Sequence, residues 1–464
     1  MTATRYEPFF PKIPGKPDRE KTVMRYPYRH PPTLFLCLFL VALGLALALA
    51  LPAAAQTDLP GDLQTLIAEA LKANPEVKQM AALHKASQET ISPAGALDDP
   101  EVGFSLKDLR TDTWRFNQDP MTQKMLELSQ KFPFPGKRRL RSEAAGEQAR
   151  SDGFSYRDKA NEIRAKVILA YWGLSLAQTS FDLTEKNKKL WEQVVQVAET
   201  RYGVGQGMQA DVLQAQVELG NYLDRLFSWR QRQESLQADL NALRSQPANT
   251  PLPRPQPLQP RPFSLNLEEL VTTAEARPQL QALKALIAKQ EKAVDLARKE
   301  YYPDVTVSLG YGIRETLAPP INEKQPDMFT SRVMFNLPIW HASKIKPKIR
   351  EELARQSAAR EAHLSAWNQL TALIKDRFVK LQRLTQQVTL YDGGIVPQAR
   401  QAAAAALASY QVGALDFGQL YQNQIAVYNA ELQLQEYLKD FEENWAELEW
   451  LVGQDLPRTA GGKK

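Results

Sequence analysis

The chain repeats one glycine-containing phrase at two places that lie 208 residues apart. Residues 201–216 read RYGVGQGMQADVLQAQ and residues 409–424 read SYQVGALDFGQLYQNQ, so both contain Tyr-x-Val-Gly. Other landmarks recur in the same order at a similar distance: Pro75 and Pro100 are matched by Pro278 and Pro303, each 203 residues later. A repeat of this length predicts two copies of one structural plan.

Long helices are predicted after each pair of prolines. From Gly136 to Gln246 the chain has 111 residues without proline. Its apolar residues recur at alternating spacings of four and three, as in a coiled coil. The stripe runs through Ile163, Val167, Ala170, Leu174, Ala177, Phe181, Trp191, Val195, Ala198 and Tyr202, and Thr184 and Lys188 interrupt it. A helix from about Lys137 to Tyr202 would be about 100 Å long at about 1.5 Å per residue.

The repeated phrase marks the place where each long helix turns back. The apolar stripe stops at this point, and glycines permit the positive φ angles that such a turn requires. We therefore expect Gly205 and Gly413 to lie at the bends of two helical hairpins. Asp211 and Asp416 fall near the start of the returning helices, where a carboxylate suits the helix dipole. A functional role for these two residues is the alternative.

Four segments of about ten residues alternate apolar and polar side chains, and they form two predicted hairpins at about 100–133 and 303–338. Tilted strands of this length cross a bilayer. Strands in hydrocarbon cannot leave edges unpaired because no water is present to satisfy them, and a closed barrel needs at least about eight strands. The chain is therefore expected to share a barrel with copies of itself. The alternative is a small soluble sheet that caps the helices.

Residues 1–55 are predicted to be a leader with a signal peptide. A basic segment precedes an apolar run from Leu34 to Leu51, and small residues at 53–55 form an A-x-A cleavage site. Because the run is about 18 residues long, a membrane anchor is the rival interpretation. Met1 and Met24 are both candidate starts.

Removal of this leader changes the chemistry that is available to the chain. The only cysteine, Cys37, lies inside it, so the mature chain would have neither disulfides nor thiolate sites. The leader holds seven Lys/Arg and three Asp/Glu, and its loss reduces the net charge from +5 to +1. Nucleic-acid binding is therefore not expected.

The predicted domains follow from the duplication. The first repeat spans 56–246, with a helical hairpin at 137–246, and the second spans 263–453, with a helical hairpin at 341–453. The segment 247–262 between them contains seven prolines and is expected to be an extended polyproline-II spacer, with a ligand for a partner domain as the alternative. Residues 454–464 form a C-terminal tail.

No catalytic, cofactor-binding or metal-binding signature is found. His84, His341 and His363 are scattered along the mature chain and lack the spacing of metal ligands. An enzyme is not predicted, because no acid–base pair or nucleophile constellation is present. The basic run GKRRLR at 136–141 is interpreted as a solvated or lipid-headgroup face, with a partner site as the alternative.

The order of strands, helices and glycine turns over residues 63–453 resembles the TolC family of outer-membrane efflux proteins. The matching residues are the two Ala/Asn-Pro entry segments, Pro100 and Pro303 at the strand starts, and the turns Arg201-Tyr202-x-Val204-Gly205 and Ser409-Tyr410-x-Val412-Gly413. The segments LSQKFPFPGKRRLR and YQVGALDFGQLYQNQ, with Asp416-Phe417, are more similar to the heavy-metal (CzcC/CusC-like) branch than to the multidrug branch.

The resemblance implies a mainly α-helical homotrimer with a small membrane β-part. Three copies would complete a twelve-stranded outer-membrane β-barrel above a periplasmic coiled-coil α-barrel. The tips would meet a periplasmic adaptor that links the channel to an inner-membrane pump of RND type. The tip residues implied by the match are Arg201, Tyr202, Val204, Gly205, Ser409, Tyr410, Val412 and Gly413. Asp211 matches an acidic tip position, whereas the second half has Gln419 there and Asp416 three residues earlier.

The function expected from this combination is passive export through the outer membrane of a Gram-negative bacterium. Heavy-metal ions are the cargo that the branch implies, and no cofactor is expected. The same duct serving multidrug efflux or type I protein secretion is the alternative within transport. A secreted coiled-coil scaffold without a pore is the alternative of another class.

Overall fold

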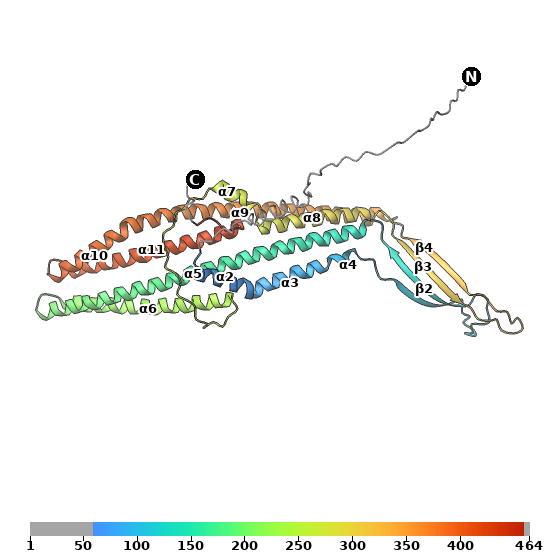
Figure 1. The fold of residues 1–464 in the computed structure, drawn as a ribbon, viewed down its shortest axis with the longest axis horizontal. Helices are drawn as coiled ribbons and strands as arrows, with labels where there is room; N and C mark the ends of the chain where they lie inside the picture. The colour runs from blue at the N-terminus through green and yellow to red at the C-terminus, as the bar shows by residue number, and fades with distance from the viewer. Residues whose placement is uncertain (1–58, 459–464) are drawn as a thin grey trace, which may run out of the picture. The chain divides into compact units, whose positions relative to one another are not determined.

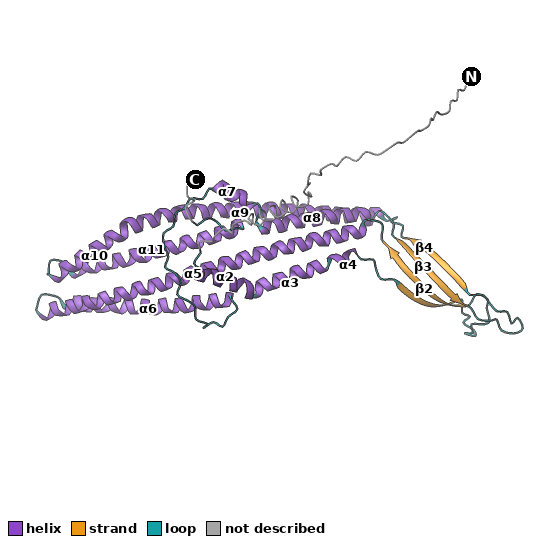
Figure 2. Cartoon of the chain, viewed as in Figure 1, coloured by secondary structure: helices purple, strands orange, loops and turns teal. Residues whose placement is uncertain are grey.

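The computed structural model of the chain describes residues 59–458. The expected leader, the two candidate starts, Cys37 and the last residues of the tail lie outside this range. The described part is mostly helical and contains one four-stranded antiparallel sheet (Figure 2). This agrees with the predicted fold class.

The two halves of the chain follow the same order of entry helices, two strands and a long helical hairpin, although α4 occurs only in the first half and the outgoing long helix is divided only in the second. The first half consists of α2 (Gly61–Ala73), α3 (Pro75–Glu89), α4 (Ile91–Gly95), β1 (Glu101–Lys107), β2 (Gln123–Phe132), α5 (Lys137–Gly203) and α6 (Gln209–Leu243). The second consists of α7 (Leu267–Ala274), α8 (Pro278–Lys299), β3 (Val305–Ile313), β4 (Met328–Phe335), α9 (Lys346–Leu390), α10 (Val396–Gln411) and α11 (Phe417–Val452). The internal duplication is therefore confirmed at the level of structure.

Helix α5 is the long helix against which most other helices of the helical part pack (Figure 1). Its 67 residues correspond to about 100 Å, and its bounds lie within one residue of those expected from the heptad stripe. Along this length α5 packs against α3, α6, α8 and α11. The interrupting residue Thr184 is fully buried and shares a hydrogen bond of 2.9 Å with the hydroxyl of Tyr428, so the stripe continues through it as a polar contact with α11.

The long helix of the second half is interrupted between α9 and α10. A π-helical turn at Tyr391–Ile395 separates the two, and Pro397 lies in the first turn of α10. The physical reason is that Pro397 has no N–H to donate to the carbonyl of Gly393, so the regular hydrogen-bond ladder cannot continue there. The interruption that a proline causes thus takes the form of a widened turn just before Pro397.

The proline-rich segment 247–262 contains neither helix nor strand, and it packs against α5. The carbonyl of Gln256 accepts a hydrogen bond of 2.7 Å from Ser175, and its N–H donates to the hydroxyl of Tyr171 over 3.0 Å. Leu258 is buried in the same hydrophobic core as α5. The segment begins with a turn, in which the N–H of Thr250 donates to the carbonyl of Pro247 over 2.9 Å, and the rest of it is fixed to the helices.

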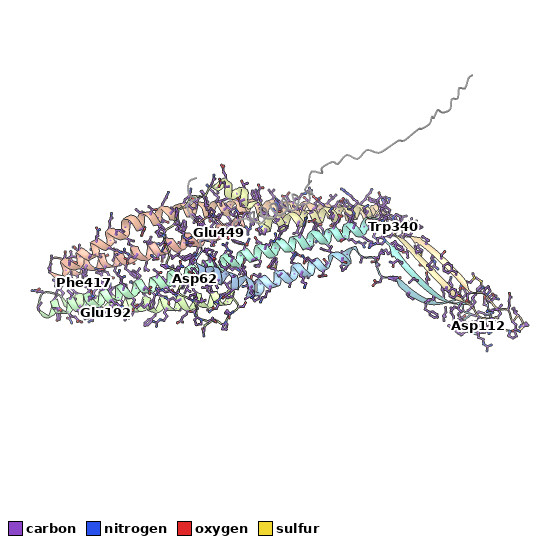
Figure 3. The ribbon with its side chains drawn as sticks, viewed as in Figure 1. Asp62, Asp112, Glu192, Trp340, Phe417 and Glu449 are labelled. Carbon is purple, nitrogen blue, oxygen red and sulfur yellow. The ribbon has the colours of Figure 1, made fainter. Side chains whose placement is uncertain are left out.

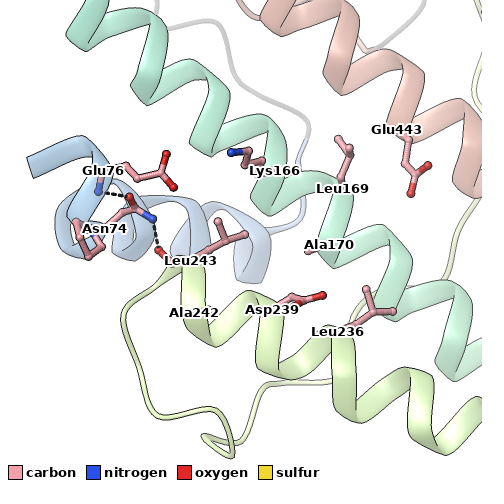
Figure 4. A pocket seen from close by; sticks show the side chains of 11 residues that line it. Asn74, Glu76, Lys166, Leu169, Ala170, Leu236, Asp239, Ala242, Leu243 and Glu443 are labelled. Atoms are coloured by element: carbon pink, nitrogen blue, oxygen red, sulfur yellow. Dashed lines mark hydrogen bonds between the residues drawn. The ribbon is translucent and has the colours of Figure 1, made fainter. Parts of the chain in front are cut away.

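Asn74 joins the entry helices to the end of the first helical hairpin (Figure 4). Its side chain caps α3 by accepting from the N–H of Glu76 over 2.9 Å, and it donates to the carbonyl of Leu243 over 3.0 Å. These residues border a cavity of about 740 Å³ that Lys166 and Asp239 also line. The Asn-Pro pair therefore ends one helix, starts the next and anchors a third.

Candidate functional site

One face of the four-stranded sheet is apolar and exposed. Residues that lie opposite each other in antiparallel strands point to the same side, and Val102 is opposite Leu128, which is opposite Leu309. The exposed apolar side chains of this face come from all four strands: Val102, Phe104, Leu106, Leu126, Leu128, Leu309, Tyr311, Ile313, Phe329, Val333 and Phe335. A continuous apolar surface of this kind marks contact with lipid or with another protein.

The opposite face of the sheet is polar and carries small residues on β3. Ser308, Gly310 and Gly312 are buried on this face, whereas Leu309 and Tyr311 on the other face are about half exposed. The sheet therefore curls toward its polar side, as a barrel wall does. Across these small residues Glu127 of β2 and Arg332 of β4 form an ion pair of 3.5 Å.

Both outer strands of the sheet have a free edge within the described residues. The strand order is β1-β2-β3-β4, and each neighbouring pair is antiparallel. The two hairpins are joined through β2 and β3, so β1 and β4 each use only one side for pairing. These two edges run antiparallel to each other, which is the relation that pairing of β4 with β1 of another copy would need.

The two turns of the repeated phrase have the same backbone geometry. They lie at the end of the helical part that is remote from the sheet (Figure 1). Gly205 has φ +74° and Gly413 has φ +79°. In the first turn the N–H of Gln206 donates to the carbonyl of Arg201 over 2.8 Å, and in the second the N–H of Ala414 donates to that of Ser409 over 2.9 Å. Both helices thus end in a Schellman motif, which explains why the glycine recurs.

Arg201 connects the two turns through its side chain. Its guanidinium donates to the carbonyl of Tyr410 over 2.7 Å and to that of Gln206 over 3.0 Å. The guanidinium carbon also lies 4.5 Å from the centre of the Tyr410 ring. The corresponding residue of the second turn is Ser409, whose short side chain offers no such bridge. The link between the hairpins is therefore made from one half only.

The two tyrosines of the phrase lie in different environments. Tyr202 is 50% exposed, whereas Tyr410 is 1% exposed and packs edge-on against Phe417. Burial, followed by the charge of Asp211, raises the pKa of Tyr410 above its ordinary value. Tyr410 therefore belongs to the core beneath the tip. Phe417 and Trp191 belong to the same core, a grouping that neither the heptad stripe nor the repeated phrase indicates.

The outer surface of the tip is apolar. Val204 is 64% exposed, Val412 is 80% exposed and Met208 is 71% exposed. These water-exposed apolar side chains at the end of a coiled coil contribute nothing to its core, so the structure of the protomer alone does not account for them. The sequence comparison of the two halves could not find Met208, because Asp416 occupies its position in the second half.

The two acidic residues near the turns have different surroundings. Asp416 is the N-cap of α11, and its carboxylate accepts from the N–H of Gln419 over 2.9 Å. Asp211 lies in the first turn of α6, whose N-cap residue is Met208 and carries no capping side chain. The helix-capping interpretation is therefore sufficient for Asp416. For Asp211 the structure shows its place in the first turn of α6 and a charge that helps to raise the pKa of Tyr410.

Comparison with known proteins decides which family has this arrangement. The family described as "Outer membrane efflux protein" matches residues 66–245 and 270–454. The chain belongs to this family. The two matched segments correspond to the two structural repeats, and the gap between them contains the proline-rich segment. The outer membrane efflux proteins are channel proteins rather than enzymes.

Relatives of known name lie at low identity. Fusaric acid resistance protein FusA of Burkholderia cepacia is 21% identical over 308 residues, which is 62% of this chain and 57% of FusA. Cobalt-zinc-cadmium resistance protein CzcC of Cupriavidus metallidurans is 24% identical over 345 residues, which is 74% of this chain and 78% of CzcC. The chain therefore spans little more than half the length of one relative and over three quarters of the other.

Among solved structures, CusC has the same fold. It superimposes with a TM-score of 0.72 at 16% identity, covering 87% of this chain and 97% of the CusC chain. That structure is described as showing conformational changes that accompany folding and transmembrane channel formation. At this identity the comparison establishes the fold of the efflux protein described here.

The side chains of residues 59–458 meet neither the requirements of a metal site nor those of a membrane-spanning helix. Among residues 59–458, no cluster of three His, Cys, Asp or Glu residues is suited to hold a metal ion. His84 contacts the carbonyl of Ala149 over 2.9 Å, which is a packing contact between α3 and α5. No helix in the described part of the chain is both long and apolar enough to cross a membrane.

The basic run at 136–141 contains a buried residue that sequence analysis assigned to the surface. Lys137 is 1% exposed, and its ammonium donates to Asp304 over 2.8 Å and to the carbonyl of Tyr302 over 3.0 Å. Asp304 also accepts from the N–H of Phe134 over 2.9 Å. The solvated interpretation is therefore wrong for Lys137, which fixes the passage from β2 into α5 against the start of β3. Figure 3 shows Trp340 at this same passage between helices and strands.

Proposed function

We propose that three copies of this chain form an export channel in the outer membrane, with a large part in the periplasm. The sheets of the three copies would close a twelve-stranded barrel, which is within the known range for such barrels. The helices would continue the barrel as a tube that ends at the glycine turns. This proposal combines membership of the family with the geometry of the sheet and the tip.

One observation carries the proposal: the sheet has an apolar exposed face, a polar face and two unpaired edges. An open edge in hydrocarbon costs several kcal/mol for each unsatisfied backbone group, on the order of the penalty for burying an unpaired amide. Four strands are too few to close alone. Pairing β4 of one copy with β1 of the next removes every edge and keeps the antiparallel pattern.

The helices supply supporting contacts between copies. Leu213, Val217 and Phe227 are exposed on α6, and Leu353 and Leu364 are exposed on α9. Such side chains on single long helices favour burial against neighbouring helices. A tube of three copies would bury them between protomers.

We assign the tip to contact with a periplasmic adaptor that couples the channel to an inner-membrane pump of RND type. Tyr202, Val204, Gly205, Val412 and Gly413 would provide the exposed contact surface. Arg201, Ser409 and the buried Tyr410 would shape it from beneath. Asp211 would act as an acidic group of the gate, and Asp416 as a cap of the returning helix.

For the cargo we propose heavy-metal ions, on the strength of the similarity to CzcC. The similarity to FusA supports a second candidate, a small organic compound. Deletion of the gene separates the two, because the strain should become sensitive to cobalt, zinc and cadmium in the first case and to fusaric acid in the second. Unchanged resistance to the three metals and to fusaric acid would contradict both cargo assignments.

Disulfide cross-linking tests the shared barrel. In a Cys37→Ser background, Ser105→Cys in β1 is combined in turn with Thr330→Cys, Arg332→Cys or Met334→Cys in β4. All four positions lie on the polar face, so one register should bring a pair within the roughly 4.4–6.8 Å that a disulfide needs between Cα atoms and give cross-linked trimers. Ser105→Cys with Val333→Cys is the control, because these side chains point to opposite faces. Monomers in every combination, together with no conductance in planar bilayers, would refute the channel.

A further inference from the structure

A cavity of about 500 Å³ lies at the passage from the sheet to the helices. Leu296 of α8 and Leu337 and Trp340 of the segment after β4 form its apolar wall, and Lys344 and Lys348 border it at the start of the next helix. Figure 3 marks the place with Trp340. The cavity therefore combines an apolar lining with basic side chains, as a site for an amphiphile does.

The apolar lining continues the apolar face of the sheet. Phe335 is the last residue of β4 on that face, and Leu337 and Ile339 follow it at alternate positions. Leu337 is 71% exposed and Trp340 is 72% exposed, so neither is covered within the described part of the chain. A tryptophan at the end of an apolar band is typical of the boundary between hydrocarbon and headgroups.

The charges around the cavity leave one cation without a partner. Lys348 pairs with Glu351 over 3.1 Å and with Glu352 over 2.9 Å. Lys344 is exposed and, within residues 59–458, forms no ion pair or side-chain hydrogen bond. Glu300, a carboxylate that lines the same cavity, lies 3.7 Å from Lys137 and keeps a side chain that is 44% exposed. A zwitterionic headgroup would therefore find a cation for its phosphate and a carboxylate for its amine.

We infer that this cavity binds a glycerophospholipid of the leaflet that faces the periplasm. The phosphate lies on Lys344, and an acyl chain lies against Leu296, Leu337 and Trp340. The inference rests on the proposed function, because the sheet must be in the membrane for the cavity to reach the lipid. Lipid is favoured over a second copy of the chain because the cavity is continuous with the apolar face and carries the unpaired cation.

The test uses the full mature chain, reconstituted into vesicles of phosphatidylethanolamine and phosphatidylglycerol with brominated acyl chains. Bromine quenches tryptophan at short range, and the signal of Trp340 is the difference between the unchanged chain and Trp340→Phe. We expect the Trp340 signal to be lost in brominated vesicles. An unquenched signal shows that protein covers the residue, for example a second copy, and overturns the inference.

A second measurement counts the phospholipid that the purified protein retains in native mass spectrometry. Lys344→Glu should weaken retention roughly ten-fold, as the loss of a hydrogen bond to a charged group does. Lys346→Glu is the matched control. It changes the charge by the same amount two residues away, and Lys346 does not line the cavity. Equal retention in the two variants overturns the site.

The channel and the lipid site fail in different ways. Single-channel conductance of the same reconstituted sample reports the channel. Conducting trimers in which Lys344→Glu and Lys346→Glu behave alike leave the channel standing and reject the lipid site. A sample that neither inserts nor conducts rejects both.

Discussion

Asn241 and Glu449 occupy the same place in the two halves of the chain, 208 residues apart, and each holds the segment that leaves its helix. Asn241 donates to the carbonyls of Ala248 and Thr250, seven and nine residues further on, over 2.8 and 2.9 Å. Glu449 accepts from the N–H of Leu456 over 3.3 Å and from the guanidinium of Arg458 over 2.9 Å, again seven and nine residues on. The same side-chain contact to the departing segment is therefore present in both halves. An amide donor makes it in the first half and a carboxylate acceptor in the second.

The contacts of Glu449 with Leu456 and Arg458 predict that Glu449→Ala lowers the stability of the C-terminal end. Arg458 is 7% exposed and would lose one of its two carboxylate partners, with Glu442 remaining at 2.8 Å. Removing one partner of a buried ion pair costs about 3–5 kcal/mol, and we expect a loss below this range because Glu442 still pairs with Arg458. The melting temperature of the purified protein measures the effect. Glu436→Ala, an exposed change on the same helix, is the control, and equal melting temperatures for the two variants would contradict the prediction.

A pH dependence follows from His363 on α9. Burial, followed by the charge of Lys284, lowers the pKa of His363 below its ordinary value. The unfolded chain then binds more protons than the folded chain, so the contribution of this residue to stability is present above about pH 6.5 and is lost as pH falls through the folded pKa. We expect His363→Gln to reduce the drop in melting temperature between pH 7.5 and pH 5. An unaltered drop in His363→Gln would count against the assignment.

The link made by Arg201 predicts a change in the closed state of the tip. Arg201→Ala removes the bond to the Tyr410 carbonyl that joins the two hairpins, so we expect larger passive conductance in planar bilayers and retained trimers. Tyr410→Phe is the matched control. It keeps the carbonyl and the ring, and the hydroxyl that it removes has no hydrogen-bond partner. Conductance that does not differ between the two variants would show that the link plays no part in closure.

The glycine turns predict a loss of efflux without a loss of assembly. Gly205→Asp or Gly413→Asp puts a side chain at a positive φ and a charge on the proposed adaptor surface. The backbone strain is about 1–2 kcal/mol, too little to unfold helices of this length. Trimers should form, whereas resistance in cells should be lost. Gly203→Ala, in the last turn of α5 with open space around it, is the control. Normal resistance in both aspartate variants would refute the tip assignment.

Much of the fold could be predicted because its signals are local. Prolines, glycines and the heptad spacing determine where α5 begins and ends, and alternation determines the strands. The buried position of Lys137 could not be predicted, because its partner Asp304 is 167 residues away. The same holds for Tyr202 and Tyr410, which share a phrase but differ in burial because only the ring of Tyr410 packs against Phe417 and the guanidinium of Arg201. Contacts between distant segments decide such details.

The bridge from Arg201 has a consequence for symmetry. Three copies with two similar hairpins each would place six hairpins in a ring, which is close to six-fold in backbone. The guanidinium is present in every second hairpin only, and a serine stands in the others. A ring of partner molecules would therefore meet two alternating kinds of hairpin tip, one with arginine and one with serine. The side-chain chemistry at the end of the tube would then have three-fold symmetry, whereas its backbone shape would be close to six-fold.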